Sequence, residues 1–108
     1  MFESLFGNPV IEKILFTLNL FEECYAYELS KTFEAPVNQF QQQLKRLEDG
    51  GIIVSRLIGR CRVYAFNPRY PFLDELRILI NRGYNFLPDS EKEKFYIKRK
   101  RPRRTGKP

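Results

Sequence analysis

The sequence predicts a mainly α-helical α+β domain in which three helices precede a two-stranded β-hairpin and a fourth helix follows it. Apolar residues recur at helical spacing in four segments, residues 8–20, 25–33, 36–49 and 71–82. Between the third and fourth segments, β-branched and aromatic residues lie on both sides of Gly59-Arg60, which is typical of two antiparallel strands joined by a short turn. With 108 residues, 43% of them hydrophobic, the chain is long enough for one compact domain with a real core.

The first helix has a clear start signal. Asn8 is a suitable N-cap and Pro9 suits the first helical position, because its fixed φ matches a helix and its missing N–H would have no partner there. The residues predicted to form its buried stripe are Ile11, Ile14, Leu15 and Leu18. Residues 8–20 are therefore predicted to form an amphipathic helix.

The next two helices are separated by a sharp turn. Residues 25–33 form a short helical pattern, and Pro36 prevents its continuation because proline biases Ala35 away from the helical region. The third helix extends to Asp49, and Gly50-Gly51 supply a left-handed stop. Its predicted buried stripe consists of Val37, Phe40, Leu44 and Leu47.

The helical pattern is lost after Gly83, where the sequence reads YNFLPDSEKEK. We therefore assign residues 1–87 to the folded domain and residues 88–108 to a charged, basic and flexible tail. The aromatic residues Phe95 and Tyr96 precede the basic run of this tail. Two interpretations of these rings stay open: they pack back on the domain, or they stack on the bases of a nucleic acid.

The net charge of +6 is distributed unevenly along the chain. Residues 98–107 contain seven cations and no anion, which leaves 12 cations against 13 anions in the rest of the chain. Within that rest, residues 1–44 carry a net charge of −4 and residues 45–69 carry +4. A charge pattern polarised in this way can steer an anionic polymer onto one side of a molecule.

The exposed side of the predicted third helix is rich in amides. A helical wheel places five polar residues opposite the apolar stripe and two at its flanks: Asn38, Gln39, Gln42, Lys45 and Arg46, then Gln41 and Gln43. An exposed glutamine adds little to stability, but its donor and acceptor match the edge of adenine in the major groove of DNA. Glutamine is also a good helix former, so a solvated helix face is the alternative. The arginine-bearing hairpin that follows favours DNA binding, because cations beside such a helix would contact phosphates.

The spacing of the apolar residues from Leu29 to Ile53 resembles the winged helix-turn-helix of small prokaryotic transcriptional regulators. LKRLEDGGII resembles the end of the recognition helix in ArsR-like and MarR-like repressors, and GRCRVYAFNP is similar to their β-hairpin wing. The resemblance covers residues 8–83 and implies a sequence-specific regulator that binds double-stranded DNA. It implies that Asn38, Gln39, Gln41, Gln42 and Lys45 enter the major groove, with Arg46 beside them, and that Arg56, Arg60 and Arg62 contact phosphate or the minor groove. Pro36 stands where these regulators usually have a serine or threonine, which leaves a phosphate contact at that position open.

Some apolar residues lie outside the predicted stripes: Phe2, Leu5 and Phe6, Phe16 in the first predicted helix, and Ile78 in the fourth. They are either part of a well-filled core with a few exposed hydrophobic residues, or a homodimer interface formed by the first and fourth helices. We favour the dimer, because related regulators pair their terminal helices and a symmetric dimer supplies a second DNA half-site.

The sequence contains no recognisable catalytic or metal-binding constellation. Without histidine, acid–base catalysis would fall to carboxylates or lysine, and their spacing reveals no pair; no glycine-rich phosphate loop is present either. Cys24 and Cys61 are isolated, so neither a thiolate metal site nor a disulfide between them is expected. We expect a protein that is not an enzyme and needs no metal or cofactor. Cys61, between two arginines, is a candidate oxidation switch because cationic neighbours favour the reactive thiolate form.

No apolar segment approaches the roughly 20 residues that a membrane span needs, and the first ten residues do not resemble a secretory signal. We therefore expect a cytoplasmic protein without a membrane partner. Two rival functions stay open beside DNA-binding regulation. One is a winged helix that binds RNA or another protein; the other is an accessory module of a separate nucleotidyltransferase chain.

Overall fold

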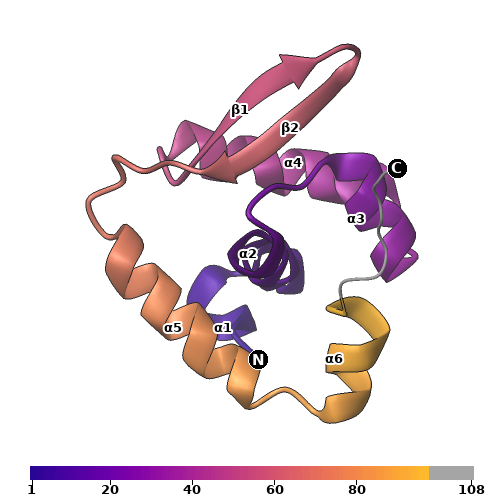
Figure 1. The fold of residues 1–108 in the computed structure, drawn as a ribbon, viewed down its shortest axis with the longest axis vertical. Coiled ribbons are helices and arrows are strands. Elements are labelled where there is room, and N and C mark those ends of the chain that lie inside the picture. The colour runs from indigo at the N-terminus through magenta and orange to yellow at the C-terminus, as the bar shows by residue number, and fades with distance from the viewer. Residues whose placement is uncertain (98–108) are drawn as a thin grey trace.

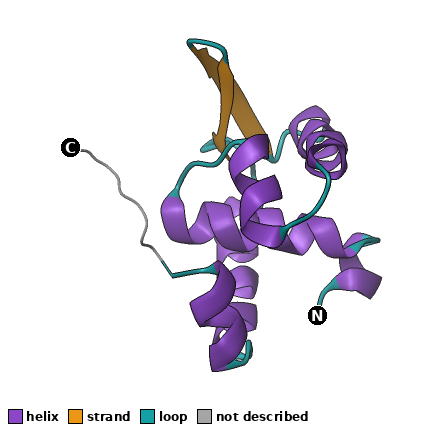
Figure 2. Ribbon diagram, turned by 90° about the vertical axis from the view of Figure 1, so that its right-hand side faces the viewer, coloured by secondary structure: helices purple, strands orange, loops and turns teal. Residues whose placement is uncertain are grey.

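The computed structural model describes residues 1–97, which form one packed body. Within this range, the elements follow the order α1 (Glu3–Phe6), α2 (Pro9–Phe21), α3 (Ala26–Phe33), α4 (Val37–Asp49), β1 (Ile53–Ile58), β2 (Cys61–Phe66), α5 (Leu73–Asn85) and α6 (Asp89–Phe95). Figure 1 shows α2 at the centre, with the other helices arranged around it. The hairpin of β1 and β2 projects from this helical body, as Figure 2 shows from the side. The predicted helices and hairpin are thus confirmed.

Helix α2 begins as the sequence predicts. The Asn8 side chain accepts hydrogen bonds from the backbone N–H groups of Val10 and Ile11, at 2.9 and 3.0 Å. These bonds satisfy two of the donors that a helix start leaves without a partner. Six residues of α2 are buried: Ile11, Ile14, Leu15, Phe16, Thr17 and Leu18. The helix is therefore buried on more than one side, since it forms the centre of the core.

The turn between α3 and α4 is fixed by short-range bonds. Glu34 ends α3 in the left-handed region, with φ 54°, and the Ser30 hydroxyl donates to the Ala35 carbonyl at 2.6 Å. Pro36 occupies the N-cap position of α4 and forms no side-chain cap there. Helix α4 buries Phe40, Leu44 and Leu47, as predicted, whereas Val37, the fourth residue of the predicted stripe, is half-buried at the first position of the helix. The left-handed conformation after α4 is that of Gly51, with φ 79°, while Gly50 is close to helical.

The wing is a regular antiparallel hairpin. Ile53 is opposite Phe66 at its base and Ile58 is opposite Cys61 at its tip. Gly59 occupies the tight turn with φ 62°, a conformation that favours glycine. On the other edge of β2, Cys24 and Tyr64 exchange two backbone hydrogen bonds, of 3.0 and 2.8 Å. This bridge attaches the base of the wing to the segment that joins α2 and α3.

The sequence interpretation of the region after Gly83 is wrong in two respects. Helix α5 continues through Gly83 to Asn85, and α6 forms where no regular structure was expected. Gly83 does not end the helix; it admits a close neighbour, because a Cβ at this position would lie 2.5 Å from the Phe2 ring. The aromatic core explains α6: the Tyr96 ring contacts Phe16 edge-on, with a centroid distance of 5.5 Å, and is buried.

The described part of the expected tail therefore packs on the domain. The Phe95 ring stacks on Phe33 with a centroid distance of 4.9 Å, which settles the open question of Phe95 and Tyr96 in favour of packing. The seven basic residues expected to make the tail cationic, at positions 98–107, lie outside the described residues.

Candidate nucleic-acid interface

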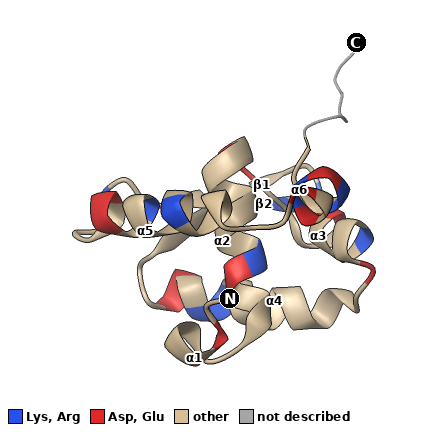
Figure 3. Cartoon of the chain, turned by 90° about the horizontal axis from the view of Figure 1, so that it is seen from below, with Lys and Arg blue, Asp and Glu red and all other residues tan. Residues whose placement is uncertain are grey.

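The six predicted contact residues of α4 are all exposed: Asn38, Gln39, Gln41, Gln42, Lys45 and Arg46. No charged residue occurs in the first eight residues of α4, and Figure 3 shows this part of the helix in tan, without blue or red. Within residues 1–97, no hydrogen bond engages the side chains of Asn38, Gln39, Gln41 or Gln42. Helix α4 therefore presents free amides at its N-terminal half and charges at its C-terminal half.

The two cations of α4 have different surroundings. Lys45 forms an exposed ion pair with Asp49 at 3.2 Å, one helical turn away. Arg46 is directed to the flank of the helix, since its Nη1 atom lies 3.9 Å from the position that a Cβ on Gly7 would occupy. The structure thus separates these residues: Lys45 lies near the amides, and Arg46 lies beside the link between α1 and α2.

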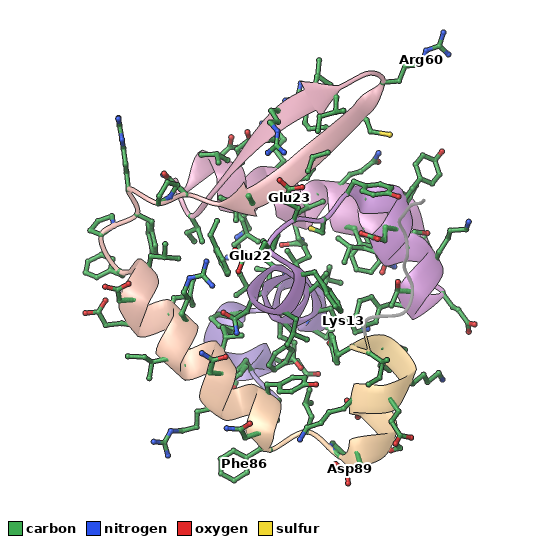
Figure 4. The ribbon with its side chains drawn as sticks, in the orientation of Figure 1. Lys13, Glu22, Glu23, Arg60, Phe86 and Asp89 are labelled. Carbon is green, nitrogen blue, oxygen red and sulfur yellow. The ribbon has the colours of Figure 1, made fainter. Side chains whose placement is uncertain are left out.

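The three arginines of the wing are exposed, but two of them have partners. Arg56 forms an ion pair with Glu23 at 2.6 Å, and Arg62 donates to the Ser55 hydroxyl at 3.0 Å. Arg60 lies at the tip and points away from the body, as Figure 4 shows. Within residues 1–97, its side chain has neither an ion pair nor a hydrogen bond.

Ser55 also connects the wing to α4, because its hydroxyl donates to Glu48 at 2.6 Å. The chain from Glu48 through Ser55 to Arg62 therefore joins the end of the helix to both strands. The sequence patterns did not indicate Ser55, Glu48 or Glu23 as residues that hold the arginines and strands of the wing in place. The strand alternation could have paired Ser55 with Arg62 on one face of the hairpin, but no local pattern indicates Glu23, which is distant in sequence from Arg56.

Only some of the residues predicted to form a dimer interface are exposed to solvent. Phe16 was expected to contribute to an interface, and this prediction is wrong because the side chain is 1% exposed and contacts Phe2 and Tyr96. Leu5 and Ile78 are 63% and 65% exposed. A shallow depression of about 440 Å³ on α5 is lined by Ile78, Asn81, Arg82, Asn85 and Phe86.

The two cysteines are free thiols in different environments. Cys24 is buried beneath the wing, and burial raises its pKa well above the ordinary value of 9.0. Cys61 is exposed next to the wing tip. Within residues 1–97, no group of three or more potential ligand side chains could hold a metal ion, and no helix is long and apolar enough to cross a membrane.

Solved structures of other proteins share this fold. Reduced HlyU from Vibrio cholerae N16961 is 22% identical to this chain over 76% of it and 80% of HlyU, with a TM-score of 0.61. YusO from Bacillus subtilis is 17% identical over 84% of this chain and 72% of YusO, with a TM-score of 0.58. The MarR family transcriptional regulator SPO1453 from Silicibacter pomeroyi DSS-3 is 12% identical over 84% of this chain and 68% of SPO1453, with a TM-score of 0.53.

No protein-family model matches the chain, and no curated protein matches it either. The likeness in three dimensions, together with the order of helices and hairpin, defines the class of the protein. It has an α+β winged helix-turn-helix fold, the fold that it shares with a MarR family transcriptional regulator.

Proposed function

We propose that this protein is a sequence-specific transcriptional regulator that binds double-stranded DNA, of the ArsR-like or MarR-like type. In this proposal the N-terminal half of α4 enters the major groove and the wing contacts the backbone. The observation that carries the proposal is the free amide face of α4. Asn38 and Gln42 are exposed beside Lys45, and within residues 1–97 no hydrogen bond engages the two amides.

The position of the charges supports the same orientation. The hairpin strands and their turn contain three arginines and no carboxylate, and Lys45 lies on the same helix face as the amides. Phosphate contacts by cations on both sides of a helix fix its register in the groove, while the amides read base edges. A winged helix that only bound another protein would have no need for this combination of free amides and flanking cations.

We also propose that the regulator is a homodimer, because one short helix reads only a half-site. In this proposal the interface consists of Leu5 of α1, Ile78 of α5 and Phe86, the residue that follows α5, because these apolar side chains are exposed. The apolar residues of α2 are largely buried, so we do not include this helix in the proposed interface. Sedimentation of the full chain and of Ile78→Asp/Phe86→Ser tests this. A dimer that the substitutions convert to a folded monomer supports the proposal, and an unchanged dimer contradicts this interface.

The direct test of DNA binding compares three full-length proteins on a pool of random 30-base-pair duplexes over a salt series. They are the unchanged chain, Gln42→Ala/Lys45→Ala, and the matched control Ser90→Ala/Lys94→Ala on α6. Loss of one phosphate contact lowers the slope of log affinity against log salt by about 0.9. Loss of an amide contact to a base costs about 1–3 kcal/mol on selected sites.

We expect Gln42→Ala/Lys45→Ala, the α4 variant, to select no preferred sequence from the pool. Its slope of log affinity against log salt should be smaller than that of the unchanged chain, while the control variant should behave like the unchanged chain. A fourth protein, with the seven cations of residues 98–107 replaced by glutamine, separates tail effects from those of α4. If duplex binding disappears in this protein while the α4 variant behaves like the unchanged chain, the regulator proposal is refuted.

A further inference from the structure

The two ends of α4 differ in the cations that surround them. The cations of the candidate interface lie on the C-terminal half of α4 and on the wing: Lys45, Arg46, Arg56, Arg60 and Arg62. Residues 25–44, which include the free amides, contain one cation against two anions, namely Lys31, Glu28 and Glu34, all of them exposed. A duplex has phosphates on both sides of the groove that a helix enters. The N-terminal end of α4 would therefore face phosphates with more anions than cations around it.

The described chain ends beside this same half of α4. Phe95 stacks on Phe33 of α3 with a centroid distance of 4.9 Å, and Phe33 in turn stacks on Phe40 of α4 at 6.0 Å. Phe40 is the buried residue in the part of α4 that bears the exposed amides. Tyr96 is buried in the core as well. Phe95 and Tyr96 thus form an aromatic anchor that fixes the chain next to α3 and α4, immediately before Ile97.

The sequence that follows the aromatic anchor is strongly cationic. Residues 98–107 contain seven cations and no anion, whereas residues 1–97 contain 12 cations against 13 anions. Ten residues reach at most about 36 Å when fully extended, which is about one helical turn of duplex DNA. Cations attached at this place are therefore within reach of the phosphates that flank the groove next to the N-terminal end of α4.

We propose that residues 98–107 bind the DNA backbone on the flank of the half-site next to the N-terminal end of α4, while the wing binds the opposite flank. The bases that the α4 amides read then lie between two sets of phosphate contacts. The cationic segment adds affinity that does not depend on sequence, and the aromatic anchor gives its contacts a fixed place along the duplex. This inference rests on the proposed DNA-binding function and extends it to a second contact surface.

The place of these contacts is tested by DNA cleavage from two labelled full-length proteins, on a duplex selected by the unchanged chain. An iron–EDTA group on the Cys61 thiol marks the wing, because Cys61 is exposed and Cys24 is buried. Lys98→Cys/Cys61→Ser carries the same group at the start of the cationic segment. We expect each label to cut one flank of the half-site, and the two labels to cut opposite flanks.

The contribution of charge is tested with the full-length protein in which all seven cations of residues 98–107 are replaced by glutamine. The loss of about four phosphate contacts lowers the slope of log affinity against log salt by about 3.6. The selected sequence should stay the same, because these contacts read no bases. Lys92→Gln/Lys94→Gln on α6 is the matched control and should leave the slope unchanged, since these cations lie over the rings of Tyr84 and Phe95.

Two results would overturn the inference while the proposed function stands. One is cleavage from position 98 that spreads evenly along the duplex or falls on the flank cut from Cys61. The other is a seven-glutamine protein with the same salt slope as the Lys92→Gln/Lys94→Gln control. In both cases Gln42→Ala/Lys45→Ala still reports on the proposed function, because that variant loses sequence selection if α4 reads DNA, whatever residues 98–107 do. If the unchanged chain selects no sequence, the proposed function fails and this inference fails with it.

Discussion

Replacing Glu23 by glutamine should strengthen binding to DNA. Glu23 forms an ion pair with Arg56 of the wing, and without this ion pair the arginine could contact a phosphate. The Glu23 carboxylate and the Arg56 guanidinium are 2.6 Å apart, and their side chains are 48% and 54% exposed. An ion pair this exposed contributes at most about 1 kcal/mol to stability. The substitution therefore releases Arg56 at little cost to the fold.

The expected gain follows from the salt dependence of phosphate contacts. One more neutralised phosphate steepens the slope of log affinity against log salt by about 0.9. Salt rises fourfold between 50 and 200 mM. Over this range the steeper slope lowers the ratio of the variant's affinity to that of the unchanged chain by a factor of about 3.5. Glu23→Gln should accordingly bind random duplex several-fold more tightly than the unchanged chain at 50 mM, with most of the gain lost at 200 mM.

Fluorescence anisotropy of a labelled duplex over this salt range measures both slope and affinity. Glu93→Gln on α6 is the matched control, since it removes the same charge from an exposed helix remote from the wing. Arg56→Gln should lower the slope if Arg56 reaches phosphate. If neither Glu23→Gln nor Arg56→Gln differs from the control, Arg56 does not contact DNA and the reasoning is refuted.

Three further predictions concern the fold. Asn8→Ala should lower the free energy of unfolding by about 1 kcal/mol in a denaturant titration, because two N–H groups of α2 lose their acceptor. Phe16→Ala should cost about 3–5 kcal/mol by the same measurement, since the ring is buried against Phe2 and Tyr96; a small loss would contradict its place in the core. Stability should fall above about pH 9, because burial raises the pKa of the Cys24 thiol and the unfolded chain then binds fewer protons than the folded one; Cys24→Ala should weaken this dependence.

The parts of the fold that depend on local pattern were predictable from sequence. The cap at Asn8, the tight turn at Gly59 and three of the four residues in the predicted stripe of α4 each depend on neighbouring residues, and the structure confirms them. Helix α6 was missed because its seven residues, DSEKEKF, contain one apolar side chain and bury none. It is held by contacts that are distant in sequence, above all the stack of Phe95 on Phe33.

The candidate interface shows the same division. The exposure of the α4 amides follows from helical periodicity, which the sequence displays directly. The number of free cations on the wing does not follow from a local sequence pattern. Arg56 is paired with Glu23, which lies in the link between α2 and α3. Counting charges along the chain therefore overestimates the cations that the wing presents freely.

Substitutions of Gln43 and Gln42 should separate effects on stability from effects on DNA binding. The two residues are neighbours on α4, but their side chains have different environments. Gln42 is exposed, whereas Gln43 is half-buried and its Oε1 atom is buried with no hydrogen-bond partner among the described residues. An unsatisfied buried oxygen costs about 1–3 kcal/mol, so Gln43→Met should raise the free energy of unfolding by about 1 kcal/mol and leave DNA binding unchanged.

The neighbouring substitution should have the opposite profile. Gln42→Met exchanges an exposed side chain, so the free energy of unfolding should change by less than about 0.5 kcal/mol while selection of a DNA sequence is weakened. Denaturant titrations and selection from a random duplex pool measure the two effects separately. If Gln43→Met alters the selected sequence and Gln42→Met does not, α4 presents a different face to DNA than its free amides indicate.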